Sequence, residues 1–244
     1  MKNYSYDKDG LKTLHNCDFL EEKYFKSAYE YTKQIIGKDY NWQWRNYIGI
    51  SLATKARNLS LNFVECGVGE GWMTISIIHY LQSKFQITPY FTLFDTFEGI
   101  DTSVVPKEEE QAWRMPAETK RKKYNYVNTD FEVTRKKIKS TTLKPNRIRF
   151  IKGSIHETLN PLQIAKITSQ GKIGFLHIDM NNSAPEIFAL EKLYPHIKNG
   201  GIILLDDYAF LGYGYQKKKI DETCKSIGIE IPITLPTGQG LIIK

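Results

Sequence analysis

Residues 63–71, FVECGVGEG, decide the fold of this chain. They consist of a short apolar run, an acid at Glu65, and glycines at positions 67, 69 and 71. This pattern is typical of a buried strand that ends in a glycine-rich turn and continues into a helix. Because glycine lacks a Cβ, the backbone of such a turn can approach a bound ligand closely. The segment therefore predicts a ligand-binding turn between a strand and a helix.

A second apolar stretch, residues 91–95 (FTLFD), ends in a carboxylate. Two strands that end at the same edge of a sheet are how α/β folds hold an adenosine group. A dinucleotide-binding turn has the spacing G-x-G-x-x-G, which would place its third glycine where Trp72 stands. The glycine spacing therefore disfavours a nicotinamide cofactor and an oxidoreductase.

The spacing E-x-G-x-G-x-G resembles motif I of the class I methyltransferases that use S-adenosylmethionine (SAM). In that motif the glycines accommodate the methionine part of SAM. The acid that closes the next strand, here Asp95, binds both ribose hydroxyls. A glycine motif alone is a weak signal, so a purely structural turn is the alternative interpretation of this segment.

The composition indicates one folded domain. At 244 residues the chain can form one α/β domain, and its 41% hydrophobic and 13% aromatic residues argue against disorder. No apolar run approaches the roughly 20 residues of a membrane helix, and the N-terminus lacks the apolar core of a signal peptide. Three widely spaced cysteines, at positions 17, 66 and 224, fit a reduced protein. We therefore expect a cytoplasmic protein without a membrane partner.

The net charge of +7 is concentrated in residues 120–149, where eleven Lys and Arg stand against Asp130 and Glu132. A solvated helical face is the simplest interpretation of such a run. The alternative is an electrostatic footprint for an anionic small molecule, such as a sugar phosphate or a nucleotide-linked sugar. A nucleic-acid partner is disfavoured because no RNA-binding motif accompanies the charge.

Strands and helices alternate from residue 62 onward. The predicted strands are 62–66, 90–95, 147–151, 173–178 and 201–206, and the predicted helices are 72–84, 125–140, 184–197 and 215–227. Residues 99–119 have no clear period, and their composition suits a mobile loop or lid. A last pair of strands, 229–235 and 240–243, flanks a glycine turn. The alternation predicts an α/β fold with a doubly wound, mostly parallel sheet and an antiparallel C-terminal edge hairpin.

Two further helices, 18–36 and 42–58, precede the first strand. We expect residues 1–60 to form a helical extension that caps one end of the sheet of a SAM-binding domain at 61–244, the two together making a single globular unit. This extension offers a surface for a homodimer. Its aromatic residues could stack on a sugar or a nucleobase, but a place in the core is the interpretation we favour. These residues are Tyr40, Trp42, Trp44 and Tyr47.

Carboxylates stand at the ends of two more predicted strands. Asp179 follows strand 173–178, and strand 201–206 ends in Asp206 and Asp207. Ligands of open α/β sheets bind outside the carboxyl ends of the strands, so these three side chains should converge beside the cofactor. Three adjacent carboxylates repel one another, and a divalent cation such as Mg²⁺ relieves that repulsion. Mg²⁺ could lower the pKa of a hydroxyl that is to be methylated. The alternative is that Asp206 or Asp207 only caps the following turn.

Five segments together resemble the macrocin/mycinamicin O-methyltransferase family, from about residue 40 to the C-terminus. In chain order they are FVECGVGEGW (63–72), FTLFDTFEGI (91–100), FIKGSIHETL (150–159), LHIDMNNSAPEIFALEKLYPHIKNGGIILLDDYAF (176–210) and LPTGQGLIIK (235–244). Members of this family are metal-dependent enzymes that methylate sugar hydroxyls in natural-product and surface-polysaccharide biosynthesis. The resemblance therefore implies a SAM-dependent O-methyltransferase whose acceptor is a sugar, a nucleotide-linked sugar or a glycosylated small molecule.

The resemblance also assigns roles to residues. It implies that the cofactor is bound by Glu65, Gly67, Gly69, Gly71, Asp95, Thr96, Ser154 and Asp179, with Ser154 on the adenine side. It implies that the metal is bound by Asp179, Asp206 and Asp207.

One position departs from the family. Members with a proposed general base carry H-[IV]-D-x-D, and this chain has Asn181 in place of the second Asp. An amide cannot accept the proton at neutral pH. Three hypotheses follow: metal polarisation suffices and the proton leaves to water or Asp179, another group such as His156 or His177 is the base, or the protein binds SAM without catalysis. We expect His177 to be a core residue and His156 to be the better candidate base. An RNA or protein methyltransferase that uses the basic segment is a further alternative.

Overall fold

The structure is a computed structural model that describes residues 4–123 and 130–244. Its central sheet has the strand order β5-β4-β3-β6-β7-β9-β8. The strands are β3 (Asn62–Cys66), β4 (Tyr90–Asp95), β5 (Ile148–Lys152), β6 (Ile173–Ile178), β7 (Ile197–Leu205), β8 (Ile233–Thr234) and β9 (Gly240–Ile243). The five strands from β5 to β7 are parallel, and β9 pairs antiparallel with both β7 and β8. The predicted parallel sheet and its antiparallel C-terminal edge are confirmed.

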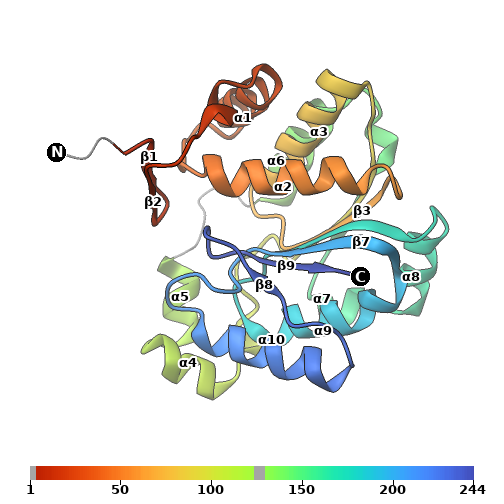
Figure 1. Cartoon of the computed structure of the whole chain (residues 1–244). Helices are drawn as coiled ribbons and strands as arrows, with labels where there is room; N and C mark the ends of the chain where they lie inside the picture. The colour runs from red at the N-terminus through yellow and green to blue at the C-terminus, as the bar shows by residue number, and fades with distance from the viewer. Residues whose placement is uncertain (1–3, 124–129) are drawn as a thin grey trace.

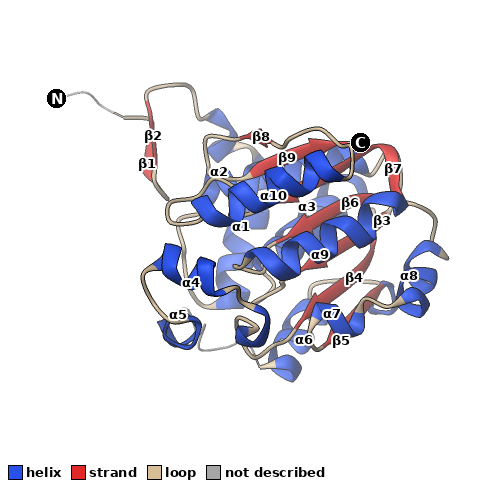
Figure 2. Cartoon of the chain, turned by 90° about the horizontal axis from the view of Figure 1, so that it is seen from below, coloured by secondary structure: helices blue, strands red, loops and turns tan. Residues whose placement is uncertain are grey.

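Helices cover both faces of this sheet (Figures 1 and 2). One face carries α1 (Lys23–Ile36), α2 (Gln43–Ala56), α3 (Trp72–Phe85) and α6 (Phe131–Ser140). The other carries α7 (Ile155–Thr158), α8 (Pro161–Thr168), α9 (Ser183–Leu193) and α10 (Gly214–Ser226). The arrangement is the predicted doubly wound fold. No described helix is both long and apolar enough to cross a membrane.

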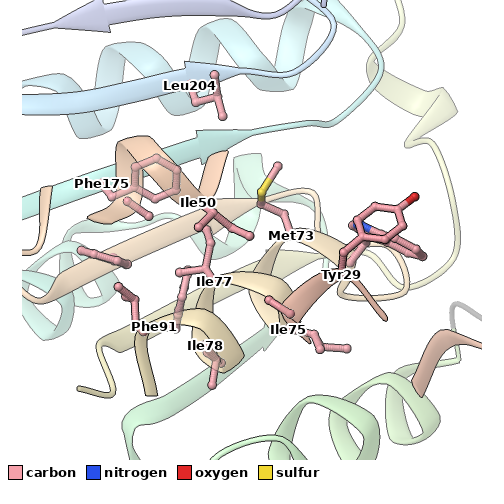
Figure 3. Close-up of a cluster of buried hydrophobic side chains, with 14 of the residues drawn as sticks. Tyr29, Ile50, Met73, Ile75, Ile77, Ile78, Phe91, Phe175 and Leu204 are labelled. Carbon is pink, nitrogen blue, oxygen red and sulfur yellow. The ribbon is translucent and has the colours of Figure 1, made fainter. Parts of the chain in front are cut away.

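Alternate residues of the buried strands feed two separate cores. Phe63, Phe175 and Leu204 face the layer of α1, α2 and α3, whereas Val64 and Leu176 face the layer of α9 and α10. This alternation follows from the two-residue period of a strand, and burial of both faces explains why the strands read as continuous apolar runs. Figure 3 shows part of the first core, with Ile50 of α2 and Met73 of α3 near Phe175 and Leu204.

The N-terminal extension lies along a face of the sheet, rather than across its end as the sequence led us to expect. Helix α2 packs on α3, β6 and β7, and α1 packs on α3. At Gly49 of α2, a Cβ would stand 2.3 Å from the sulfur of Met73, so the side chain of Met73 fills the space that the glycine leaves. Trp44 and Tyr47 are partly buried and pack against Phe19 of the core, which agrees with the place in the core that we favoured for them.

Several short elements were not predicted. A hairpin of β1 (Tyr6–Lys8) and β2 (Leu11–Thr13) precedes α1, and residues 99–119 contain α4 (Lys107–Trp113) and the start of α5 (Ala117–Lys123) instead of an irregular loop. Helices α7 and α8 were also missed, and four single turns of 3-10 helix lie at 18–21, 102–104, 145–147 and 194–196. The first residues of the predicted helix 125–140 lie outside the described residues.

Candidate active site

Backbone hydrogen bonds bring the ends of β3, β4, β6 and β7 to one level of the sheet. Gly67 donates its amide hydrogen to the carbonyl of Phe94 (2.8 Å), and Asp179 donates to Cys66 (2.8 Å). Asp206 in turn donates to Ile178 (2.9 Å). The glycine turn, Asp95, Asp179 and Asp206 therefore meet at the carboxyl edge of the sheet, which is the arrangement that the sequence predicted.

Two glycines of the turn are required by the packing of the protein itself. Gly67 has a φ of +86°, and a Cβ on it would stand 1.8 Å from the carbonyl oxygen of Asp179. Gly71 has a φ of +88°, precedes α3, and would place a Cβ 2.7 Å from the Ile138 side chain of α6. Gly67 thus lets the turn after β3 touch the backbone after β6, beside the ligand space.

A cavity of about 150 Å³ lies at this edge. Four parts of the chain line it. The turn after β3 contributes Gly67, Val68, Gly69 and Glu70, and the segments at the ends of β4 and β5 contribute Asp95, Thr96, Gly99, Asp101, Gly153 and Ile155. The ends of β6 and β7 contribute His177, Asp179, Asn181, Asn182 and Asp206, and the N-terminal extension contributes Tyr40, Trp42, Arg45 and Asn46. Tyr40 and Trp42 therefore line the cavity, and they also pack, partly buried, against the core that we favoured for them. Glu65 and Trp72 also line it.

Asp95 fastens β4 to the glycine turn. Its Oδ2 accepts hydrogen bonds from the backbone amides of Val68 (2.6 Å) and Gly69 (2.8 Å), and its Oδ1 accepts one from Phe97 (2.6 Å). Burial raises the pKa of Asp95, although these amide donors oppose the shift. The side chain therefore shapes the turn and also faces the cavity, where the resemblance places the ribose hydroxyls.

Two other predicted cofactor residues lie near Asp95. The Thr96 hydroxyl donates to the carbonyl of Gly99 (2.7 Å) and orders the turn after β4. Ser154 sits between two cavity-lining residues of the segment after β5, and its side chain hydrogen bonds to Asp101, which also lines the cavity.

His177 links Glu65 of β3 to Asp206 at the end of β7. Its Nδ1 lies 2.9 Å from Glu65 Oε1, and its Nε2 lies 3.6 Å from Asp206 Oδ1. Burial alone would lower the pKa of His177, but these two carboxylates outweigh it and raise the pKa to about 10. Thr74 donates to the other oxygen of Glu65. His177 is thus buried, as expected, and acts as a charged link between two acids.

We call Asp179, Asp206 and Asp207 the carboxylate cluster. Among the described residues, the atoms that could share a metal ion and lie within 4.8 Å of one another belong to His177, Asp179 and Asp206, and Asp207 is not one of this group. Burial, Asp206 and Asp207 raise the pKa of Asp179 well above its usual value. Burial and the neighbouring Asp206 raise the pKa of Asp207 to about 7. The cluster therefore carries repulsion that a cation would relieve.

An arginine from the N-terminal extension already contacts the carboxylate cluster. Arg45 Nη1 donates to Asp206 Oδ2 (2.5 Å) and to the Asp206 carbonyl (2.9 Å), and Arg45 Nη2 donates to the Thr237 carbonyl (3.3 Å). Burial would raise the pKa of Asp206, but Arg45 and His177 outweigh burial and hold this pKa well below its usual range. The sequence analysis did not identify Arg45, which lies 161 positions away from Asp206.

Both ends of the side-chain amide of Asn181 form hydrogen bonds with neighbouring side chains. Its Nδ2 donates to Asp179 Oδ1 (3.2 Å), and its Oδ1 accepts from the Tyr213 hydroxyl (2.7 Å). The backbone of Asn181 has a φ of +62°, which asparagine adopts more readily than most residues. Its backbone N–H donates a hydrogen bond to Glu186. His156, the other residue considered as a base, packs its ring against Phe188 with 4.6 Å between ring centroids.

Helices α4 and α5, which we call the lid helices, hold the segment after Asp179 in place. Both carboxylate oxygens of Glu109, on α4, accept from the backbone amide of Ser183 (3.1 and 3.0 Å), and one also accepts from its hydroxyl (2.6 Å). Lys120, on α5, donates to the carbonyl of Asn181 (3.3 Å). The lid helices therefore dock on the start of α9, next to the cavity.

Buried polar atoms in the cavity wall lack partners among the described residues. They are both side-chain amide atoms of Asn182, Asn46 Oδ1 and Trp72 Nε1. Native proteins rarely leave such atoms unpaired, because each costs about 1–3 kcal/mol. The cavity wall is therefore complementary to a polar ligand.

This fold and this site define a class I SAM-dependent methyltransferase: a doubly wound sheet, a glycine turn after β3, and an acid at the end of β4, around one cavity. The chain belongs to the macrocin-O-methyltransferase (TylF) family, whose sequence profile matches residues 44–234. It is therefore an enzyme, a SAM-dependent O-methyltransferase.

Solved structures with the same fold include three O-methyltransferases. The O-methyltransferase NovP is 20% identical with a TM-score of 0.67, covering 82% of this chain and 79% of that one. The apo structure of CalS11, a TDP-rhamnose 3'-O-methyltransferase of calicheamicin biosynthesis, is 15% identical with a TM-score of 0.58, covering 94% and 96%. A Bacillus cereus O-methyltransferase in complex with SAH is 13% identical with a TM-score of 0.51, covering 89% and 91%. A comparison with curated protein sequences found no match.

Proposed function

We propose that the enzyme transfers the methyl group of SAM to a hydroxyl of a sugar, most simply a nucleotide-linked sugar or a glycosylated small molecule. The observation that carries this proposal is that Asp179 and Asp206 line the same cavity as the glycine turn and Asp95. The residues proposed to bind SAM and the carboxylates proposed to act on the acceptor hydroxyl thus line the same cavity. The TDP-sugar acceptor of CalS11 lends support by analogy of fold.

The carboxylate cluster suits Mg²⁺, although Arg45 already neutralises one of its members. The donor atoms are carboxylate oxygens, which Mg²⁺ prefers. Burial first, and then repulsion by the neighbouring carboxylates, raises the pKa of Asp179 and of Asp207. We propose that Asp179, Asp206 and Asp207 hold the ion. Bound there, Mg²⁺ would lower the pKa of the acceptor hydroxyl.

The residues of the chain then align the two substrates. SAM supplies the electrophilic methyl group, and transfer forms the O–CH₃ bond as the C–S bond breaks. Asn181 fixes the carboxylate of Asp179 through its Nδ2, and the proton of the hydroxyl leaves to Asp179 or to water. His177 and Glu65 hold Asp206 from behind. No general base at position 181 is required in this scheme.

Aromatic residues of the N-terminal extension support a sugar or nucleotide acceptor. Tyr40 and Trp42 stack with 4.3 Å between ring centroids and 14° between planes, and Trp72 meets both edge-on. The Tyr40 hydroxyl donates to Glu70 (2.6 Å), which fixes the ring. Rings held in this way, in a cavity wall, are a suitable surface for the apolar face of a sugar or for a base.

The proposal is tested by incubating the protein with SAM, Mg²⁺ and a panel of nucleotide-linked sugars and glycosylated small molecules. We expect acceptor-dependent formation of S-adenosylhomocysteine that EDTA abolishes. Asp179→Asn should lower turnover at least about a hundredfold, because Asp179 is one of the proposed metal ligands. Turnover that is insensitive to both EDTA and this substitution would contradict the metal assignment.

Several residues of the basic segment serve the structure of the protein itself rather than a free basic surface. Lys120 is buried, Arg147 donates to the carbonyl of Thr88 (2.6 Å), and Arg135 pairs with Glu132 (2.7 Å). Part of this segment, residues 124–129, lies outside the described residues. A homodimer formed through the N-terminal extension and a cytoplasmic location stay predictions.

A further inference from the structure

Arg45 occupies an unusual place for an arginine, inside a carboxylate cluster that suits a divalent ion. It is 5% exposed and lines the cavity. Its Nη1 donates to both the carboxylate and the backbone carbonyl of Asp206. Phe210 adds a cation–π contact, with 4.9 Å from the guanidinium carbon to the ring centroid. These contacts fix the positive charge at the cavity wall.

Asp206 is almost saturated with protein donors. Its Oδ2 accepts from Arg45, and its Oδ1 accepts from Gln239 Nε2 (2.9 Å) while His177 Nε2 lies 3.6 Å away. A divalent ion at Asp206 would therefore share this carboxylate with a guanidinium. Like charges at such distances repel strongly in a buried site, since the interaction is only partly screened.

A second carboxylate competes for the same guanidinium. Asp9 lies in the turn between β1 and β2, and its Oδ2 stands 3.3 Å from Arg45 Nε. Its side chain is 9% exposed. The hairpin is anchored beside the start of α2, because the Tyr6 hydroxyl donates to the Asn41 carbonyl (3.0 Å) and to Gln43 (3.1 Å). Arg45 thus lies between one acid of the hairpin and one acid of the cluster.

We infer that Arg45 and Asp9 are positioning residues that set the affinity of the carboxylate cluster for its divalent ion. Arg45 neutralises Asp206 and lowers this affinity, and Asp9 raises it by balancing the guanidinium charge. The N-terminal hairpin, 197 positions from Asp206 in sequence, thereby tunes the metal site. This inference rests on the metal site of the proposed function.

The test is a titration of the full-length, SAM-loaded protein with Mn²⁺, with free Mn²⁺ followed by electron paramagnetic resonance. Arg45→Gln should bind Mn²⁺ about tenfold more tightly, because a buried positive charge is lost. Asp9→Asn should bind it about threefold more weakly, because the guanidinium is then unbalanced. Arg45→Lys, which keeps the charge, should stay near the wild type. Arg57→Gln, at the far end of α2, is the matched control and should leave the affinity unchanged.

The opposite signs separate this inference from a merely structural role, which would weaken binding in every variant. If Arg45→Gln binds Mn²⁺ as the wild type does or more weakly, while its SAM binding and thermal unfolding are normal, this inference is wrong and the proposed function is unaffected. If neither the wild type nor Arg45→Gln binds Mn²⁺ while both bind SAM, the metal part of the proposed function falls with it. If Arg45→Gln does not fold, Asp9→Asn still tests the inference, because asparagine tolerates the φ of 51° at this position. Unchanged or tighter Mn²⁺ binding in Asp9→Asn would contradict the inference.

Discussion

At the scale of single residues, the carboxyl edge of the sheet is organised by acids that each make several contacts. Asp95 accepts three backbone hydrogen bonds from the turns on either side of it, and Glu65 bridges Thr74 and His177. These acids were visible in the sequence because each follows or ends an apolar strand. The hydrogen bonds by which they order the protein itself could not be predicted, because contacts between distant segments produce no local sequence pattern.

Asp95→Asn should weaken SAM binding by about tenfold to a hundredfold. The amide offers one acceptor oxygen where the carboxylate offers two, so at least one of the bonds that hold Val68, Gly69 and Phe97 is lost along with the charge. Calorimetric titration with SAM measures the effect. Glu98→Gln, an exposed neighbour, is the control, and equal affinities for all three proteins would refute this role of Asp95.

Lys120 gives the folded state a distinctive pH dependence. Burial lowers its pKa from 10.5 to about 8, with Trp113 and Tyr213 rings 3.6 and 4.1 Å from its ammonium nitrogen. Between about pH 8 and 10.5 the unfolded chain holds more protons, so the contribution of this group to the free energy of unfolding increases as pH rises. Below pH 8 both states are protonated, and the cost of burying the charge is fully present.

Lys120→Met should therefore remove an increase in stability that the wild type shows between about pH 8 and 10. Urea unfolding midpoints of the two proteins, measured at several pH values, isolate this contribution because all other titrating groups are shared. Parallel curves for the two proteins across that window would show that Lys120 keeps an ordinary pKa when folded.

At the scale of elements, the sequence predicted the long strands and helices well and the short ones poorly. Strands β3, β4 and β6 match their predicted bounds because they are largely apolar runs that are buried in the middle of the sheet. Helices α4 and α5 have seven residues each, with charged residues throughout, so no apolar stripe marks them. Their order comes from docking on α9, where Glu109 binds the amide and hydroxyl of Ser183.

Glu109→Ala should increase the local opening of the lid helices without changing the affinity for SAM. A carboxylate that binds the first amide of a helix contributes about 1 kcal/mol, so α4 and the start of α9 should exchange backbone amide hydrogens several-fold faster. Hydrogen-exchange mass spectrometry measures this, and Glu108→Ala, exposed on the same helix, is the control. If the two variants exchange alike, α4 is held by other contacts.

At the scale of the whole molecule, the N-terminal extension is part of the enzyme and not an appendage. Its helices share one hydrophobic core with α3 and the sheet, and its residues Tyr40, Trp42 and Arg45 line the cavity. The sequence separated residues 1–60 from 61–244 because the strand pattern begins at residue 62. Contacts such as Arg45 with Asp206 join segments far apart in the chain, and local patterns cannot reveal them.

A chain that begins at residue 61 should fail to fold. Removing α2 exposes Phe175 and Leu204, both fully buried, and burial of one such side chain contributes about 1.5–3 kcal/mol. A typical domain has only about 5–15 kcal/mol of stability, so losing the whole helical layer exceeds it. Circular dichroism and thermal unfolding of the truncated protein provide the test. A cooperative transition near that of the full chain would mean that the two parts are independent.

The central claim is that this cavity transfers a methyl group from SAM to a sugar hydroxyl. The most direct measurement follows a ¹³C-labelled methyl group from SAM by nuclear magnetic resonance, with a nucleotide-linked sugar and Mg²⁺ present. The account predicts that the sulfonium signal is replaced by an O-methyl signal on the sugar, and that Asp179→Asn leaves the label on SAM. A label that stays on bound SAM with every sugar offered, or that appears on RNA or protein instead, would contradict it.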